Sequence, residues 1–227
     1  MLTRQKVIAA VILIAATILH GGDFASLSNE AATAVKAKDF ASAEAKYAEA
    51  MNAAGDSVQK CRAIIGKYQA LRSQKKWKEA ESFMTEAVED EMLKPQEIRN
   101  LLNTFASSYL WTNRLDFALE LLQQAQNQPC PKTSNEYFRT YDYMSTIYMR
   151  KKQPQTALEV ISKVLILKGL HPANYYTGHM DAGKACEKLN NKEEALKHYR
   201  LALENGKKVK YKFNYSDAEK AIERLSK

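Results

Sequence analysis

The stretch NKEEALKHYRLALENG, residues 191–206, decides the fold, because its small and large apolar residues stand at helical spacing. Ala195, Tyr199 and Ala202 are four and three residues apart, so a helix places all three on one face. Small residues let a second helix approach closely, and the large residue fills the space between them. This stretch therefore predicts a helix that packs tightly against neighbouring helices.

The same small, large, small pattern occurs five times along the chain. Its leading residues are separated by 37, 38, 39 and 38 positions. A fixed period of this length is typical of stacked supersecondary units that share one continuous core. The residues predicted to form this repeat packing are Ala43, Tyr47, Ala50, Ala80, Met84, Ala87, Ala118, Leu122, Ala125, Ala157, Ile161, Val164, Ala195, Tyr199 and Ala202.

Each repeated helix is preceded by another segment with helical apolar periodicity. These partner segments cover residues 27–37, 61–73, 98–111, 137–149 and 175–189, and short polar turns follow them. A helix pair cannot close its own core, so the pairs must stack into a solenoid in which each contacts mainly its neighbours. The amphipathic segment 216–227 is expected to cap the last pair.

Start signals agree with this phasing. Capping boxes are indicated by four pairs three residues apart, namely Asp56 with Gln59, Thr133 with Glu136, Asn191 with Glu194, and Ser216 with Glu219. Three prolines suit the first turn of a helix, where a missing N–H costs little, and these are Pro95, Pro154 and Pro172.

With this repeat, the chain resembles the tetratricopeptide-repeat (TPR) family, whose helix-turn-helix unit of about 34 residues carries the same alanine, aromatic, alanine spacing. The resemblance covers residues 26–204, and NKEEALKHYRLAL is the best-matching segment. It implies an all-α, right-handed α-solenoid of five repeats plus a C-terminal capping helix. The chain departs from the family in its longer period and in the small position of the first helix, where only Gly183 supplies a glycine.

The resemblance also implies a binding groove, because proteins of this family are similar in gripping a peptide or a partner helix on the concave face. Carried over by phase, the groove residues are Arg62, Arg72, Asn103, Trp111, Arg139, Met149, Arg150, Met180, Lys184 and Lys188. Basic edges around Trp111, Met149 and Met180 would suit an acidic and apolar peptide. In the alternative interpretation, these apolar residues pack against the adjacent repeat and the arginines are solvated.

The N-terminus has the pattern of a signal peptide. Arg4 and Lys6 precede an uninterrupted apolar run of thirteen residues, Val7–Leu19. As a helix this run spans about 20 Å, which is short for a hydrocarbon core of about 30 Å. Residues 1–22 are therefore expected to be a signal peptide or an uncleaved membrane anchor, followed by the solenoid in 23–204 and a basic segment with the capping helix in 205–227.

The chain is basic, with a formal net charge of +8, of which residues 1–22 contribute two positive charges. The segment GKKVKYKF, residues 206–213, alternates lysine with apolar residues. Its lysines could bind anionic lipid, or its apolar residues could pack on the last repeat while the lysines face water. Three cysteines at wide spacing argue against a disulfide framework; Cys61 and Cys186 fall in helical patterns, and Cys130 lies in a loop between two prolines.

The sequence contains no recognisable motif of catalytic or metal-binding residues. The four histidines show no metal-ligand spacing, and the sequence has no glycine-rich phosphate loop and no GxSxG motif. We therefore expect a non-catalytic protein-binding scaffold of the cell envelope, exported and periplasmic or envelope-associated, with no cofactor, no metal and no nucleic-acid partner. A membrane-surface adaptor, or an accessory subunit of an enzyme or of a secretion or assembly complex, stays open as an alternative, as does the oligomeric state.

Overall fold

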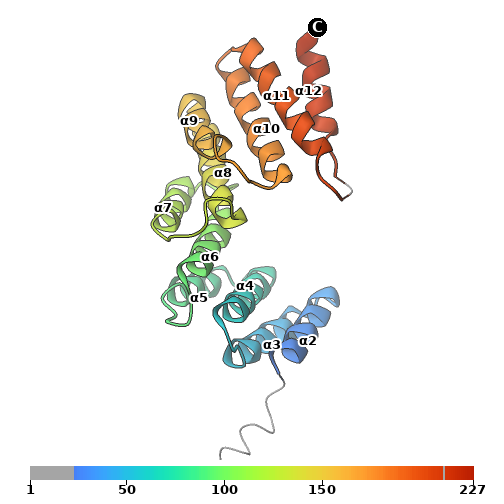
Figure 1. Cartoon of the computed structure of the whole chain (residues 1–227). Coiled ribbons are helices and arrows are strands. Elements are labelled where there is room, and N and C mark those ends of the chain that lie inside the picture. The colour runs from blue at the N-terminus through green and yellow to red at the C-terminus, as the bar shows by residue number, and fades with distance from the viewer. Residues whose placement is uncertain (1–22, 212) are drawn as a thin grey trace, which may run out of the picture. The chain divides into compact units, whose positions relative to one another are not determined.

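The computed structural model describes residues 23–211 and 213–227, and these residues form α-helices joined by turns, with no strand among them (Figure 1). The helices are α2 (Phe24–Lys36), α3 (Phe40–Asn52), α4 (Ser57–Ser73), α5 (Trp77–Ala87), α6 (Pro95–Ser107), α7 (Leu115–Gln126), α8 (Asn135–Arg150), α9 (Pro154–Leu165), α10 (Pro172–Lys188), α11 (Lys192–Lys207) and α12 (Ser216–Ser226).

The helices follow the predicted order of five pairs and a final single helix. Each of the helices α2 to α4 contacts the next one in the chain, and so does each of the helices α7 to α11. The first helices of adjacent pairs also touch, α2 with α4 and α8 with α10. This neighbour-to-neighbour packing confirms the all-α solenoid that the repeat period predicts.

The chain divides into two compact units, the first ending at Glu97 and the second beginning at Ile98. In the first unit, a core cluster is built on Leu27, Ala50 and Ala63. In the second unit, one cluster gathers around Phe138 and Ile161, and another gathers α10, α11 and α12 around Tyr199. Fourteen of the fifteen repeat-packing residues are buried, and Tyr47 is half-buried.

Four of the turns inside the pairs share one backbone conformation. Lys38, Lys75, Lys152 and Asn190 each stand five residues before the leading alanine, with φ between 58° and 62°. In every case the N–H of the next residue donates to a carbonyl in the last turn of the preceding helix, as from Asn191 to Cys186 at 2.9 Å. This left-handed cap ends the first helix and keeps the spacing within each of these pairs constant.

The start signals are confirmed in five places. Asp56 accepts a hydrogen bond from the Gln59 N–H at 2.8 Å, and Asn191 accepts one from the Glu194 N–H at 3.1 Å. The prolines at 95, 154 and 172 are the first residues of α6, α9 and α10.

Two predicted caps are wrong. The N-cap of α8 is Ser134, whose hydroxyl accepts from the Tyr137 N–H at 3.1 Å, because Thr133 still belongs to the preceding turn. Ser216 is already the first residue of α12, and Tyr215, the N-cap of this helix, makes no side-chain hydrogen bond to the first turn.

The third pair differs from the sequence-based expectation, because α6 ends at Ser107 and not at Trp111. The hydroxyls of Ser107 and Ser108 donate to the Thr104 carbonyl, which competes with continuation of the helical ladder. Tyr109 then packs edge-on against Phe117, with 5.1 Å between ring centroids. The segment that follows is a turn, and its backbone lacks the left-handed residue of the other four pairs.

The basic C-terminal segment packs Phe213 onto the last pair, whereas Tyr211 stays 58% exposed beside His171. Helix α11 continues to Lys207, so residues 205–207 are helical. Beyond it, Phe213 meets Tyr176 edge-on at 5.0 Å between centroids, and Tyr211 stacks on His171 at 6.1 Å. The lysines at 207, 208 and 210 are exposed. This is the second of the two interpretations that the alternating pattern allowed.

Across residues 23–211 and 213–227, no helix is both long and apolar enough to cross a membrane. The predicted signal peptide or anchor occupies residues 1–22 and lies outside the described residues.

Candidate functional site

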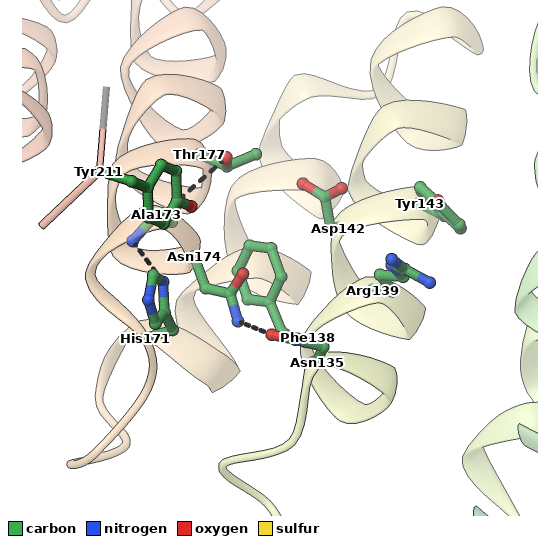
Figure 2. A pocket seen from close by; sticks show the side chains of 10 residues that line it. All are labelled: Asn135, Phe138, Arg139, Asp142, Tyr143, His171, Ala173, Asn174, Thr177 and Tyr211. Atoms are coloured by element: carbon green, nitrogen blue, oxygen red, sulfur yellow. Dashed lines mark hydrogen bonds between the residues drawn. The ribbon is translucent and has the colours of Figure 1, made fainter. Parts of the chain in front are cut away.

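A pocket of 390 Å³ opens between α8 and α10, the first helices of the fourth and fifth pairs (Figure 2). The residues that line it are Asn135, Phe138, Arg139, Asp142, Tyr143, His171, Ala173, Asn174, Thr177 and Tyr211. Those on α8 recur three and four positions apart, so they share one helix face. The pocket therefore lies on the face that the repeat geometry turns toward the neighbouring first helix.

One end of the pocket is closed by polar contacts and an aromatic stack. The Asn174 side-chain amide donates to Asn135 Oδ1 at 2.9 Å and so links α10 to α8. His171 caps α10 by accepting from the Ala173 N–H at 3.2 Å, and the Tyr211 ring stacks on its imidazole. The C-terminal segment thus supplies one wall of the pocket.

Charged groups gather at the other end. Asp142 on α8 lies near Asp181 on α10, and Lys184 Nζ is 3.0 Å from Asp181 Oδ1. Burial, as the larger cause, and the negative charge of Asp181, as the second, raise the pKa of Asp142 well above its usual range. Burial tends to lower the pKa of Lys184, but the two aspartates outweigh it and the net pKa is raised. This arrangement favours a protonated Asp142 beside an ionised Asp181–Lys184 pair.

Neither a protein-family model nor a curated protein sequence matches the chain. Solved structures do match. Yeast Tom70 has a TM-score of 0.69 at 13% identity, covering 90% of this chain and 39% of that one. PilF of Pseudomonas aeruginosa has a TM-score of 0.63 at 15% identity, and the match covers 89% of this chain and 82% of PilF. YrrB, a TPR protein, has a TM-score of 0.53 at 17% identity, and the match covers 88% of this chain and 91% of YrrB. The chain has a TPR fold. At these identities the likeness establishes the fold alone.

Within this TPR fold, the predicted groove residues of the second unit fall into separate environments. Arg139 is exposed at the pocket, Lys184 is held by Asp181, and Lys188 is exposed near the end of α10. Met180 is 7% exposed and belongs to the core cluster around Tyr199, so its assignment as an apolar anchor in the groove is corrected. Its position on α10 turns it toward α11 and away from the open face.

Asn103 is also misassigned to the groove, because it is fully buried. Its amide donates to the Glu136 carbonyl at 2.9 Å, and its Oδ1 accepts from the Thr140 hydroxyl at 3.0 Å. Thr140 in turn accepts from Arg99 Nε at 2.9 Å, so this buried network ties α6 to α8. Phase alone could not separate a polar residue in the interface from one in the groove.

Trp111, Met149 and Arg150 do not line the pocket. Trp111 is 77% exposed in the turn after α6, with the Arg150 guanidinium 5.4 Å from its ring centroid. Arg150 also donates to the Thr112 carbonyl at 3.1 Å, and Met149 is half-buried. Because α6 stops early, Trp111 lies off the first helix on which it was predicted.

Arg62 and Arg72 belong to the first unit. Arg62 is exposed on α4, whereas the Arg72 guanidinium lies 5.6 Å from the Tyr68 ring centroid and 5.7 Å from that of Trp77. These ring contacts hold Arg72 against its own helix pair.

Sequence reasoning missed Tyr211, which lines the pocket, and the pairing of Asp181 with the pocket residue Asp142. Asp142 and Asp181 stand 39 positions apart, close to the repeat period, and this spacing was the signal that adjacent first helices would bring them together. No comparable signal existed for Tyr211, since its place depends on how the C-terminal segment folds back. Among the described residues, no group of three or more His, Cys, Asp or Glu side chains is placed to hold a metal ion.

Proposed function

We propose that this TPR-fold chain is a non-catalytic scaffold that binds an extended segment of another protein in the α8–α10 pocket. The observation that carries the proposal is the pocket itself, with charged, amide and aromatic groups converging from the first helices of two adjacent repeats. YrrB, which shares the fold, is described as having an unusual peptide-binding site. Chemical groups of these kinds are what peptide recognition needs.

The pocket offers complementary groups for a peptide. The amides of Asn135 and Asn174 can exchange hydrogen bonds with a peptide backbone, and the exposed Tyr211 ring offers apolar surface, whereas Phe138 is buried in the core. The exposed guanidinium of Arg139 at the pocket would attract acidic residues of the segment and steer its approach. The proposed ligand is therefore a segment with apolar residues inside the pocket and acidic residues near Arg139.

Selection of displayed twelve-residue random peptides on the chain tests this proposal. We expect peptides that bind wild type and lose at least about tenfold in affinity, about 1.4 kcal/mol, on Thr177→Trp, which fills the pocket. A matched pair of charge reversals supplies the control: Arg139→Glu at the pocket should weaken binding, and Lys163→Glu on α9, also exposed, should not. Failure to select any peptide, or peptides insensitive to Thr177→Trp, would contradict the proposal.

We also propose that the scaffold works in the cell envelope, on the strength of the apolar run Val7–Leu19 after two basic residues. A fusion of residues 1–30 to alkaline phosphatase, an enzyme active only after export, tests this. The fusion should be active, and Val11→Lys with Ile14→Lys, which interrupt the run, should abolish the activity. An active double variant would contradict export through this segment.

A further inference from the structure

Asp142 presents an unsatisfied acceptor at the pocket. Its Oδ1 is buried and accepts no hydrogen bond from an N–H or hydroxyl donor among the described residues, although the residue as a whole is partly exposed and lines the pocket. The Asp142 carboxyl is hydrogen-bonded to the carboxyl of Asp181, which can hold only if one of the two carries a proton. A buried carboxylate oxygen without a donor is costly, so such atoms are rare unless a ligand or a proton completes them. Figure 2 shows the Asp142 side chain extending from α8 between the pocket residues of α8 and α10.

The charged groups around Asp142 do not supply the missing donor. From α10, Asp181 faces it and Lys184 lies nearby, but Lys184 is paired with Asp181 at 3.0 Å. From its own helix, Arg139 and Tyr143 flank it, and neither has a hydrogen bond or ion pair to Asp142 among the described contacts. The two carboxyl groups therefore share one proton in the empty pocket, where Lys184 is paired with Asp181 and the charge of Arg139 also reaches Asp142.

We propose that Asp142 and Asp181 form a subsite for a cationic group of the bound segment, a lysine or arginine side chain or an α-amino group. This inference rests on the proposed peptide-binding function and names the chemistry of one position in the ligand. An ammonium or guanidinium group placed there donates to Asp142 Oδ1 and balances the second carboxylate. The rim arginine then selects acidic residues, while this interior pair selects one basic residue.

Proton balance follows from the charges. In the empty pocket Asp142 keeps its proton, because burial and Asp181 disfavour a second negative charge. When a cation enters, Asp142 gives this proton to the solvent and its carboxylate pairs with the cation. Binding therefore exchanges one proton for one cationic group, and the net charge of the subsite is unchanged. A resting pair that merely shares a proton, and needs no ligand, would show no such exchange.

Carboxyl-carbon NMR titration of the folded chain with n-butylammonium, a minimal lysine side chain, tests the subsite. We expect n-butylammonium to lower the titration midpoint of Asp142 by about one pH unit or more in a saturable manner. Uncharged n-butanol, of the same length, should leave the Asp142 midpoint unchanged. Asp39, an exposed helix-cap carboxyl observed in the same spectrum, is an internal control whose midpoint should not move with either additive. Asp142→Asn, which is close in shape, should remove saturable n-butylammonium binding.

An unaltered Asp142 midpoint, equal effects of n-butylammonium and n-butanol, or saturable binding that persists in a folded Asp142→Asn chain would overturn the subsite. The wild-type titration decides the matter even if the variant does not fold. The probe has no peptide backbone, so its outcome is separate from peptide selection. Selected peptides that are blocked by Thr177→Trp and contain no required basic residue would leave the proposed function standing and remove the subsite alone.

Discussion

Tyr199 on α11 packs its ring against the backbone of Gly183 on α10 so closely that a Cβ at position 183 would lie 2.6 Å from the ring. The ring is 1% exposed, and its hydroxyl donates to Glu187, so it has little room to move. Glycine is thus required by the approach of the two helices. This contact is the structural counterpart of the small, large, small pattern that defines the repeat.

The Gly183 contact predicts a large effect of a single methyl group. Gly183→Ala should destabilise the second unit by about 1–3 kcal/mol, because the buried ring must leave its rotamer or the helices must separate. Thermal and urea unfolding measure the change. Gly55→Ala is the control, since a Cβ there meets only the Gln59 side chain at 3.7 Å. Equal stability of the two variants would contradict the close-packing explanation.

The left-handed turns predict a stabilising substitution. At Lys38, whose φ is 60°, a side chain is unfavourable, so Lys38→Gly should raise the free energy of unfolding by up to about 1 kcal/mol. Ala37→Gly, one residue earlier with φ of −76°, should lower it by about 0.5–1 kcal/mol, because glycine only adds flexibility there. Opposite signs for these adjacent substitutions in denaturant unfolding would support the cap, and equal signs would reject it.

The buried network around Thr140 predicts a cost for removing one hydroxyl. Thr140→Val leaves Arg99 Nε and Asn103 Oδ1 without their partner, which should destabilise the second unit by about 1–3 kcal/mol. Thr146→Val, on the same helix and half-buried, should change the stability by less than about 0.5 kcal/mol. Urea unfolding of both variants checks the difference, and a neutral Thr140→Val would show that the network contributes no net stability.

The histidine pair between α10 and α11 predicts a pH dependence of stability. His179 Nδ1 and His198 Nδ1 lie 3.0 Å apart. Burial, and then the neighbouring His198, lower the pKa of His179 to about 4; burial also lowers the pKa of His198, against the opposing charge of Glu194. The folded chain therefore binds fewer protons than the unfolded chain as the pH falls through the ordinary histidine pKa. The contribution of this histidine pair to the free energy of unfolding is therefore fully present above about pH 6.5 and is lost as the pH falls toward 4.

Each such proton contributes a slope of at most about 1.4 kcal/mol per pH unit. Denaturant unfolding between pH 7.5 and 4.5 measures it. His179→Gln should flatten the slope, whereas His171→Gln, at the exposed N-cap of α10, should leave it nearly unchanged. An unchanged slope in His179→Gln would mean that carboxyl groups, and not this pair, govern the decline.

The fold could be predicted from the sequence because its information is local and repeated. Helical periodicity, proline at helix starts and the recurring alanine spacing each act within one helix or between neighbours, so the five pairs and the cap followed directly. The failures mark competition between local signals. Ser107 and Ser108 ended α6 before Trp111 through side-chain hydrogen bonds that periodicity does not register.

The candidate site was less predictable, because helical periodicity predicts the helix face on which a residue lies but not whether neighbouring helices bury it. Met180 and Asn103 had the phase of groove residues but are buried in helix interfaces. Gly66 was not singled out either, yet a Cβ at this position would lie only 2.4 Å from the Tyr47 ring of the preceding pair.

The sequence by itself determined that this chain is a stack of helix pairs, because small and large side chains at fixed spacing allow only close helix packing. Only the tertiary structure decided which polar groups meet. Asp142 and Asp181 are 39 residues apart, and their shared environment exists because α8 and α10 lie side by side. Proximity across helices sets burial and charge, and these are the quantities that give the pocket its chemistry.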